Sequence, residues 1–323
     1  MKKVLVVRTD RFGEFLLIIP ALRAIKETLG NPEITAVVSP GVVSLAREVP
    51  YIDRVIPWVQ ASHPFFQELL FAHGLQKEGY DAAVVFNPSK QMHLITFLAG
   101  IPVRAGYARK WGKLLLSHRM RDTKHLGSKH ETEYNLDLAG LMGASTADKT
   151  LSLRRNNDIM RSLHEISPIL DSEKPLVAVH PFTSDPVKQW PIEYFKELIR
   201  DILAEYKVKV ILVGGPQERR EYADFFTGLK TDGVLDLVGE TTLVQLAGVL
   251  RRCRLLVSGD SGPVHLASAV GTPVVAIFRS DLQGKTAKRW GPLSERSVVV
   301  ERAGMEYISV EQVLLACGKV IDL

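Results

Sequence analysis

The feature that most constrains this chain is the alternation of short, uninterrupted apolar segments with longer segments of helical spacing. Residues 4–8 are almost wholly apolar, and Leu22, Ile25 and Leu29 then recur at helical spacing up to Gly30. The same alternation continues with strand-like segments at 34–38, 55–57 and 82–86 and helical patterns at 42–48 and 65–78. Such apolar strands, separated by helices, predict a parallel sheet covered by helices on both faces.

The pattern starts again after a polar stretch, residues 154–175, that is rich in charges and turn formers. Strand-like segments follow at 176–180, 208–214, 255–258 and 274–278, and helical ones at 192–206, 218–229, 242–251 and 264–270. A length of 323 residues fits two domains of about 150 residues each. We therefore predict an α/β protein of two Rossmann-like, doubly wound domains, residues 1–165 and 172–323, with ligands at the carboxyl ends of the strands and in the cleft between the domains.

Composition and cysteine usage exclude several classes of protein. A 46% hydrophobic and 24% charged chain is typical of a soluble globular protein. Cys253 and Cys317 form neither a metal-ligand spacing nor a disulfide framework, which fits a reducing compartment. Arg8 interrupts the first apolar segment too early for a signal peptide, and no apolar stretch approaches the ~18 residues of a membrane span. We expect a cytoplasmic protein, attached at most peripherally to a membrane.

The sharpest local motif, Gly-Asp-Ser-Gly-Pro-Val-His, follows a predicted buried strand and opens a helix. Gly262 allows the backbone to approach a ligand closely, and Pro263 suits the first helical turn, where its missing N–H costs nothing. The free amides of that turn favour an anion, and His265 lies close enough in sequence to reach the same ligand. The alternative is that Asp260 or Ser261 only caps the helix.

A second loop between a predicted strand and helix extends from His180 to Pro191. Thr183 and Ser184 offer hydroxyl donors there, and Lys188 offers a positive charge for a phosphate group. A single lysine in a loop is usually only solvated. Its interest comes from lying at the same end of the same predicted sheet as the first motif.

Two further loops carry a glycine beside an acidic residue. Gly214-Gly215 at a strand end, followed by Glu218, is similar to a nucleotide loop whose acid holds ribose hydroxyls, although neither G-x-G-x-x-G nor Walker A is present. Gly13-Glu14 follows the first strand, and a carboxylate beside a cleft can serve as a general base. The alternative is that each acid only occupies the first turn of a helix, where its negative charge interacts favourably with the helix dipole.

Residues 104–130 form a basic segment with eight Lys or Arg against one acid, a net charge of +7 within a chain whose total is +5. Its cations are Arg104, Arg109, Lys110, Lys113, Arg119, Arg121, Lys124 and Lys129. The segment is either a solvated loop or a docking surface for an anionic glycolipid or an anionic membrane, and we favour docking. The rest of the chain is close to neutral, and the segment lacks the interleaved aromatics of a nucleic-acid groove, so no nucleic-acid partner is expected.

The four loop motifs described before the basic segment together resemble glycosyltransferase family 9, the ADP-heptose:lipopolysaccharide heptosyltransferases. The matching segments are residues 4–8 with Gly13-Glu14, 19–22, 180–191, 260–267, 271–276 and 290–292, in family order. The resemblance implies a GT-B fold, with a nucleotide-sugar held mainly by the second domain. It implies an inverting, metal-independent transfer of heptose from ADP-heptose to an inner-core lipopolysaccharide acceptor at the cytoplasmic face of the inner membrane, without a cofactor. The last helix could pack back on the first domain.

The resemblance also implies roles for individual residues. Glu14 takes the place of the family's catalytic Asp, with Asp10 as its backup, and Lys188 stabilises the leaving group. Donor-binding residues would be Thr183, Ser184, Lys188, Glu218, Thr241, Asp260, Ser261, Gly262 and His265. Acceptor-binding residues would be Asp10, Arg11, Arg104, Arg109, Lys110 and Lys113.

Other readings of the sequence stay open. The chain could use another nucleotide-sugar or another acceptor, or it could be a nucleotide-sugar epimerase, although an epimerase needs no basic docking segment. A dinucleotide-dependent dehydrogenase is disfavoured because G-x-G-x-x-G is missing. A nucleic-acid-binding protein is disfavoured because no helix-turn-helix, zinc or RNP-type signature is present.

Overall fold

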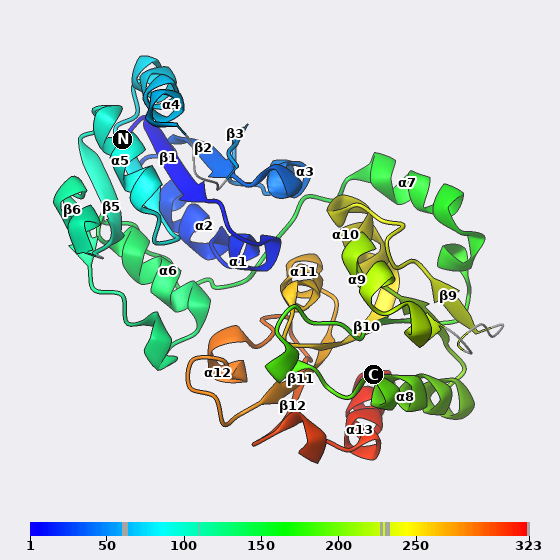
Figure 1. Cartoon of the computed structure of the whole chain (residues 1–323). Coiled ribbons are helices and arrows are strands. Elements are labelled where there is room, and N and C mark those ends of the chain that lie inside the picture. Colours follow the sequence, from blue (N-terminus) through cyan, green and yellow to red (C-terminus); the bar gives the residue numbers. More distant parts are fainter. Residues whose placement is uncertain (60–63, 109, 227–228, 230–232, 322–323) are drawn as a thin grey trace. The chain divides into compact units, whose positions relative to one another are not determined.

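The computed structural model describes residues 1–59, 64–108, 110–226, 229 and 233–321. The chain divides into two compact units, Met1–Lys149 and Thr150–Leu323 (Figure 1). Each unit holds one six-stranded sheet, and every strand pair within it is parallel. The predicted α/β class with two parallel sheets is confirmed.

The first sheet has the strand order β3-β2-β1-β4-β5-β6. Its strands are β1 (Lys3–Arg8), β2 (Glu33–Val38), β3 (Arg54–Pro57), β4 (Ala82–Val85), β5 (Val103–Tyr107) and β6 (His118–Met120). The α-helices of this unit are α1 (Phe12–Leu16), α2 (Ile19–Thr28), α3 (Val43–Arg47), α4 (Phe65–Glu78), α5 (Lys90–Leu98) and α6 (Glu131–Gly140). Short 3-10 helices are η1 (Pro40–Val42), η2 (Lys110–Leu115) and η3 (Lys124–Leu126).

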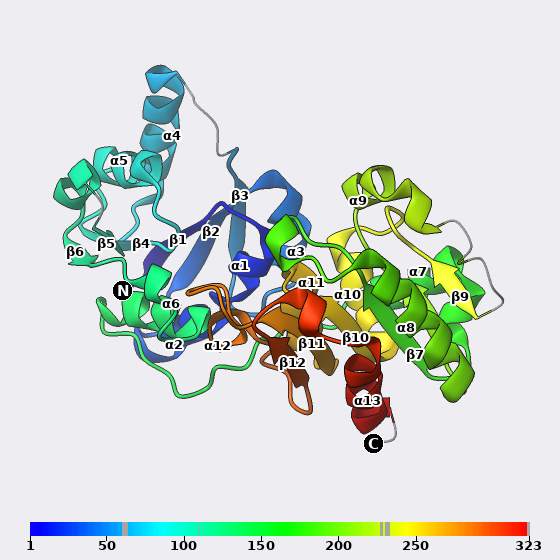
Figure 2. The same cartoon turned by 60° about the horizontal axis from the view of Figure 1, so that its bottom comes forward.

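The central strands of this sheet are apolar except at the two ends of β1, because helices cover both of their faces. Leu5 and Val7 pack with Leu75 of α4 and Ile95 of α5 in one core. Val4 and the other alternate residues of β1 are equally buried, on the side of the sheet where α2 and α6 lie (Figure 2). This arrangement is the one that an uninterrupted apolar strand predicts.

The second sheet has the order β12-β11-β10-β7-β8-β9. Its strands are β7 (Leu176–His180), β8 (Lys209–Leu212), β9 (Val234–Asp236), β10 (Cys253–Gly259), β11 (Val274–Arg279) and β12 (Val298–Arg302). Its helices are α7 (Asn157–Ile166), α8 (Ile192–Glu205), α9 (Pro216–Glu221), α10 (Leu243–Arg252), α11 (Gly262–Val270), α12 (Ala287–Trp290) and α13 (Val310–Ile321), with 3-10 helices η4 (Pro168–Asp171), η5 (Pro186–Lys188), η6 (Ala223–Phe226) and η7 (Met305–Tyr307). Numbered from its own first strand, each sheet has the order 3-2-1-4-5-6, the Rossmann order.

The polar stretch between the two patterns is structured rather than a linker. Asn156 caps α7 by accepting from the backbone amides of Asp158 and Ile159. The helix packs against α10, where Leu163 lies so close to Gly248 that an added Cβ would be 3.2 Å from it. Residues from Thr150 onward therefore belong to the second unit, earlier than the predicted domain start.

One side of helix α13 is buried in the core of the second unit. Val313, Cys317 and Val320 are part of the cluster that packs on the second sheet and α8. Burial of this helix therefore does not require it to pack back on the first domain, which the sequence left possible. No helix in the described residues combines the length and the apolar character required to cross a bilayer.

Candidate active site

Each unit has a pair of loops that follow the two neighbouring strands where the strand order reverses. The loops after β1, β7 and β10 were predicted as site loops, whereas the loop after β4 was not. In the first unit, the loop after β1 lies against the loop after β4, because Asn87 Nδ2 donates to Thr9 Oγ1 at 3.1 Å. In the second, β7 and β10 are neighbours, and His180 is the register partner of Ser258. Both pairs of loops therefore start at a topological switch point, where sheets of this kind bind ligands.

Glu14 lies in the first turn of the short helix α1, which the buried side chain of Phe15 anchors in the first unit. Burial raises the pKa of Glu14, and the negative charge of Asp10 raises it further. Arg8 and Arg11 oppose that shift in part. A carboxylate with a raised pKa accepts a proton more readily at neutral pH than an ordinary surface carboxylate does, which suits a general base.

Asp10 is held by the last residue of β1. Arg8 is buried, and its Nε donates to Asp10 Oδ1 at 2.7 Å. Asp10 is thereby fixed in orientation beside the Glu14 helix. Of the two carboxylates that the sequence offered as base, Asp10 is engaged in an ion pair and Glu14 has the raised pKa.

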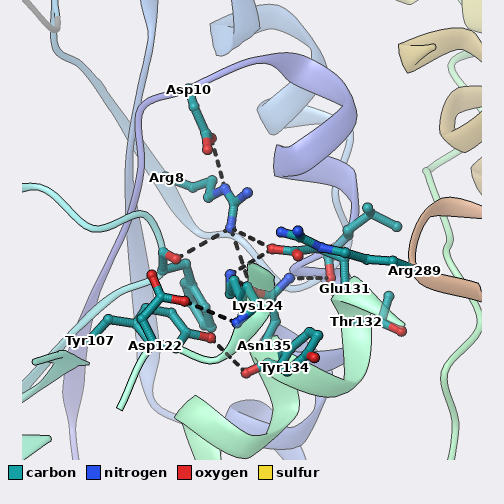
Figure 3. Close-up of polar contacts among 12 residues, drawn as sticks. Arg8, Asp10, Tyr107, Asp122, Lys124, Glu131, Thr132, Tyr134, Asn135 and Arg289 are labelled. Carbon is teal, nitrogen blue, oxygen red and sulfur yellow. Dashed lines mark hydrogen bonds and ion pairs between the residues drawn. The ribbon is translucent and has the colours of Figure 1, made fainter. Parts of the chain in front are cut away.

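A buried ionic network supports this loop from below (Figure 3). Glu131, at the start of α6, accepts from Lys124 Nζ at 2.6 Å and lies 3.6 Å from Arg8 Nη1. Asn135 Oδ1 lies 3.4 Å from Lys124 Nζ, which also stands 4.6 Å from the centre of the Tyr107 ring. A fully buried carboxylate needs such partners, because an unpaired buried charge is strongly destabilising.

This network corrects the sequence interpretation of Lys124. Its side chain is buried, so it does not belong to a docking surface. Within the same segment, Lys129 is paired with Asp137 at 2.6 Å, whereas Lys113, Arg119 and Arg121 are exposed. The docking surface that the charge pattern predicts is therefore smaller than the segment itself.

Arg104 has a structural role in the basic segment. Its Nε donates to the Leu115 carbonyl at 2.7 Å, its Nη1 donates to the Ile101 carbonyl, and its guanidinium lies over the Phe97 ring. It thereby joins β5 to the end of η2. Lys110 begins η2, and Arg109 lies outside the described residues.

In the second unit, Lys188 and Asp260 form a close ion pair. Lys188 ends η5 and Asp260 follows β10, and Nζ lies 2.5 Å from Oδ2 with side chains that are only 16% and 9% exposed. Burial raises the pKa of Asp260, and the charge of Lys188 counters part of that rise. The predicted meeting of these two loops is confirmed, and the lysine is oriented by the acid.

A hydrogen-bonded chain beneath this pair was not identified as part of the site from the sequence. His180 Nδ1 lies 3.2 Å from both Ser258 Oγ and Ser261 Oγ, and the two hydroxyls are 2.9 Å apart. Burial lowers the pKa of His180 to about 4, so its ring is neutral at physiological pH. The only sequence signal for this chain is that His180 and Ser258 end two predicted strands.

Ser261 stands at the N-cap of α11, but its hydroxyl makes no capping bond. It is directed instead to Ser258 Oγ, His180 Nδ1 and the Gly259 carbonyl. The capping alternative for Ser261 is therefore wrong, and the first-turn amides of α11 receive no cap from it. His265, in the same helix, is buried, with its ring centre 6.3 Å from that of Trp290.

The loop that carries Thr183 and Ser184 is held in place by cations from elsewhere in the unit. Asp185 pairs with Lys285 at 2.8 Å, and Arg279 Nη1 donates to the Val187 carbonyl at 2.7 Å. Thr183 Oγ1 accepts from the Asp185 amide, and Ser184 is exposed. The loop is therefore held by contacts in the residues that directly precede Lys188.

Glu218 lies in the first turn of α9, as the helix-start alternative described. Its Oε2 accepts from the Gly215 amide at 2.7 Å, so it caps the start of the helix. Nearby, the Gly239 amide donates to the Gly214 carbonyl at 2.9 Å, so the loop that leads to Thr241 lies beside the Gly214-Gly215 turn. Among the described residues, no group of three or more His, Cys, Asp or Glu could hold a metal ion.

The sequence is similar to those of known heptosyltransferases. The sequence model of "Glycosyltransferase family 9 (heptosyltransferase)" matches residues 69–313. Lipopolysaccharide heptosyltransferase 2 of Salmonella typhimurium is 25% identical over 310 residues, covering 92% of this chain and 87% of its own length.

Solved structures show the same fold. The Escherichia coli ADP-heptose lps heptosyltransferase II superposes with a TM-score of 0.85 at 22% identity, covering 99% of this chain and 98% of that one. A glycosyl transferase family 9 protein of Veillonella parvula gives a TM-score of 0.87 at 19% identity, with 99% and 97% covered. The predicted GT-B fold is confirmed.

Proposed function

The chain belongs to glycosyltransferase family 9, the heptosyltransferases, and on that premise we propose that it moves a heptose from ADP-heptose to an inner-core lipopolysaccharide acceptor. The transfer inverts the anomeric carbon and uses no metal ion. The acceptor is an anionic glycolipid at the cytoplasmic face of the inner membrane, to which the enzyme attaches peripherally.

The observation that carries this proposal is the convergence of Lys188, Ser261 and Gly262 at the start of α11. A diphosphate in that place meets a cation and the amides of a helix N-terminus, which favour negative charge as the ADP leaves. The ion pair with Asp260 holds Lys188 at the site before the donor arrives. Around them, Thr183 and Ser184 supply hydroxyls, Glu218 binds the ribose, Thr241 meets the adenine with its backbone, and His265 completes the donor site.

The first unit supplies the base and the acceptor site. Glu14 accepts the proton of the acceptor hydroxyl while that oxygen forms a bond to the anomeric carbon. The bond from that carbon to the β-phosphate oxygen breaks, and its electron pair leaves with ADP. Acceptor contacts come from Asp10, Arg11, Arg104, Arg109, Lys110 and Lys113, and the raised pKa of Glu14 supports its part in the step.

A panel of nucleotides tests the donor assignment. Thermal unfolding is followed with ADP, UDP, GDP, CMP and NAD, because a ligand stabilises the folded state by RT ln(1 + [L]/Kd). We expect a selective response to ADP that falls by roughly 10- to 100-fold in affinity in Lys188→Ala, since a hydrogen bond to a charged group contributes about 1.5–3 kcal/mol.

Lys207→Ala is the matched control, because Lys207 is an exposed lysine of the same unit. A response confined to UDP would favour another nucleotide-sugar or an epimerase, and one confined to NAD a dehydrogenase. Unchanged ADP affinity in Lys188→Ala would reject the phosphate role of this residue.

A further inference from the structure

Helix α4 exposes four large apolar side chains on one side of its first two turns. Phe65, Phe66, Leu69 and Leu70 are 57%, 66%, 39% and 55% exposed. Positions separated by one, four and five residues share one side of an α-helix. These residues, hereafter the apolar face of α4, form a continuous exposed row rather than scattered surface residues.

The packing of α4 does not require this face. The opposite side of the helix is the packed one, where Ala72 and Leu75 are buried and Phe71 stacks on Trp58 with ring centres 4.3 Å apart. Helix α4 also extends beyond its neighbours at the edge of the first unit (Figure 2). The exposed row therefore adds nothing to the folded core that the structure describes.

Lysines lie near the apolar face, with one acid among them. Of the two acids of α4, Glu78 pairs with Arg54 at 2.7 Å, whereas Glu68 accepts from the neutral Gln91 at 2.7 Å and keeps its negative charge. The Gln91 contact places the first turn of α5, with the exposed Lys90, directly beside the first turn of α4.

An exposed lysine and an exposed leucine of the next helix extend this surface. Helix η2 packs against α5, and it carries the exposed Lys113 and Leu114. Neither α5 nor η2 contains an acidic residue. The surface that starts at the apolar face thus combines exposed apolar side chains with exposed lysines.

We propose that the apolar face of α4 inserts into the surface of an anionic lipid bilayer, with Lys90 and Lys113 contacting the lipid headgroups. Aromatic and leucine side chains beside lysines are the composition that lies at a membrane interface, where acyl chains meet the apolar groups and anionic headgroups meet the cations. A second copy of the chain fits less well. Four side chains present only a few hundred Å², against the ~800 Å² per partner of a stable interface, and their flanking lysines would repel one another.

This inference rests on the proposed function only in that the acceptor is anchored in a membrane. The test is co-sedimentation of the full chain with vesicles of phosphatidylcholine alone or mixed with phosphatidylglycerol. We expect the wild type to bind the mixed vesicles, and Phe65→Ser/Phe66→Ser to bind at least about tenfold more weakly. Tyr307→Ser/Leu315→Ser is the matched control, because these second-unit side chains are 66% and 62% exposed. It should bind like the wild type.

Two charge-reversal variants separate the electrostatic component of vesicle binding from the apolar one. Lys90→Glu should weaken binding to the mixed vesicles by about three- to tenfold, whereas Lys207→Glu, at an exposed lysine of the second unit, should leave it unchanged. The folded state of every variant is verified by its unfolding midpoint and its response to ADP.

Three results would overturn the proposal: equal vesicle binding by wild type and Phe65→Ser/Phe66→Ser, binding only when the glycolipid acceptor is in the vesicle, or a wild-type dimer that this variant converts to a monomer. Transfer to a deacylated, water-soluble acceptor keeps the two proposals separable. If the wild type fails to transfer to this acceptor, the proposed function is rejected, while the vesicle-binding result still stands. If Phe65→Ser/Phe66→Ser still transfers to it, only membrane docking is lost in that variant.

Discussion

The loops at the two switch points differ sharply in their chemistry, although they are built on the same strand order. After β1 and β4, the first unit has two carboxylates, Asp10 and Glu14, above a buried network of charges. After β7 and β10, the second unit has one lysine, two linked serines and a helix N-terminus without a side-chain cap. A shared topology fixes where ligands bind, and the loop residues decide which ligand it is.

The difference matches what the two halves of a sugar transfer need. A base must be partly desolvated to have a raised pKa, and the burial of Glu14 does this. A leaving diphosphate needs positive charge and hydrogen-bond donors, and these are the roles that we propose for Lys188 and the start of α11. Four predictions test whether the two sites divide the chemistry in this way.

Substitution of the proposed base, Glu14, should produce the largest effect. We expect Glu14→Gln to lower the transfer rate by about 10²–10⁴-fold, the usual contribution of general base catalysis, with ADP affinity unchanged. In Asp10→Asn, the acidic limb of the rate profile should shift to lower pH, because the charge of Asp10 raises the pKa of Glu14. Rates near wild type in Glu14→Gln, measured in single-turnover assays, would reject Glu14 as the base and leave Asp10 as the first-unit candidate.

The buried network should be the next most sensitive. Glu131→Gln leaves Lys124 and Arg8 without their shared buried carboxylate, and we expect the free energy of unfolding to fall by about 3–5 kcal/mol. Asp137→Asn is the matched control on the same helix, because its pair with Lys129 is exposed and should contribute less than about 1 kcal/mol. Denaturant titration measures both. Similar losses in the two variants would mean that the network is no more than a surface ion pair.

Sequence patterns predicted the central framework better than its edges. Leu176–His180 and Phe65–Glu78 begin and end where the apolar pattern and helical spacing placed them. β5 and β6 lie within the basic segment and were not predicted, because Arg104 and Arg119 interrupt the apolar pattern on short strands near the sheet edge. Edge strands tolerate such charges, which also block unwanted strand pairing.

The candidate site, too, was predicted only in part. That the loops after β7 and β10 would meet followed from their positions at strand ends. The link from His180 to Ser258 and Ser261 did not, because it depends on the register of two strands that lie far apart in the sequence. The burial of Lys124 was missed for a similar reason, since only the fold shows that Glu131 is enclosed.

The third prediction concerns the ion pair of the second unit. Lys188→Met leaves the buried Asp260 without its cation, so stability should fall, and Asp260→Asn in the same chain should recover part of the loss. We expect a coupling energy of about 0.5–3 kcal/mol from the double-mutant cycle. ADP affinity should stay low in the double variant, because the recovered stability does not restore the phosphate contact. Additive losses of stability would show that the pair is not coupled.

At neutral pH the smallest effects should come from two buried histidines, one from each unit, and they differ in a way that the structure explains. Burial lowers the pKa of both His93 and His180 to about 4, below the ordinary value of 6.5. Between these values the unfolded chain binds more protons than the folded one, so stability is full above pH 6.5 and is lost as the pH falls toward 4. The loss reaches at most about 3 kcal/mol for each histidine.

At neutral pH the two histidines should respond differently to replacement. Neither ring nitrogen of His93 has a hydrogen-bond partner among the described residues, whereas His180 is bonded to two serines. We therefore expect His93→Leu to leave stability at pH 7 nearly unchanged and to reduce the loss in acid. His180→Leu should lower stability by about 1 kcal/mol at pH 7, and it should weaken ADP binding because Ser261 loses its orientation. If His93→Leu were instead as destabilising at pH 7 as His180→Leu, the first-unit histidine would have to make a polar contact of its own, and the contrast between a site histidine and a core histidine would be wrong.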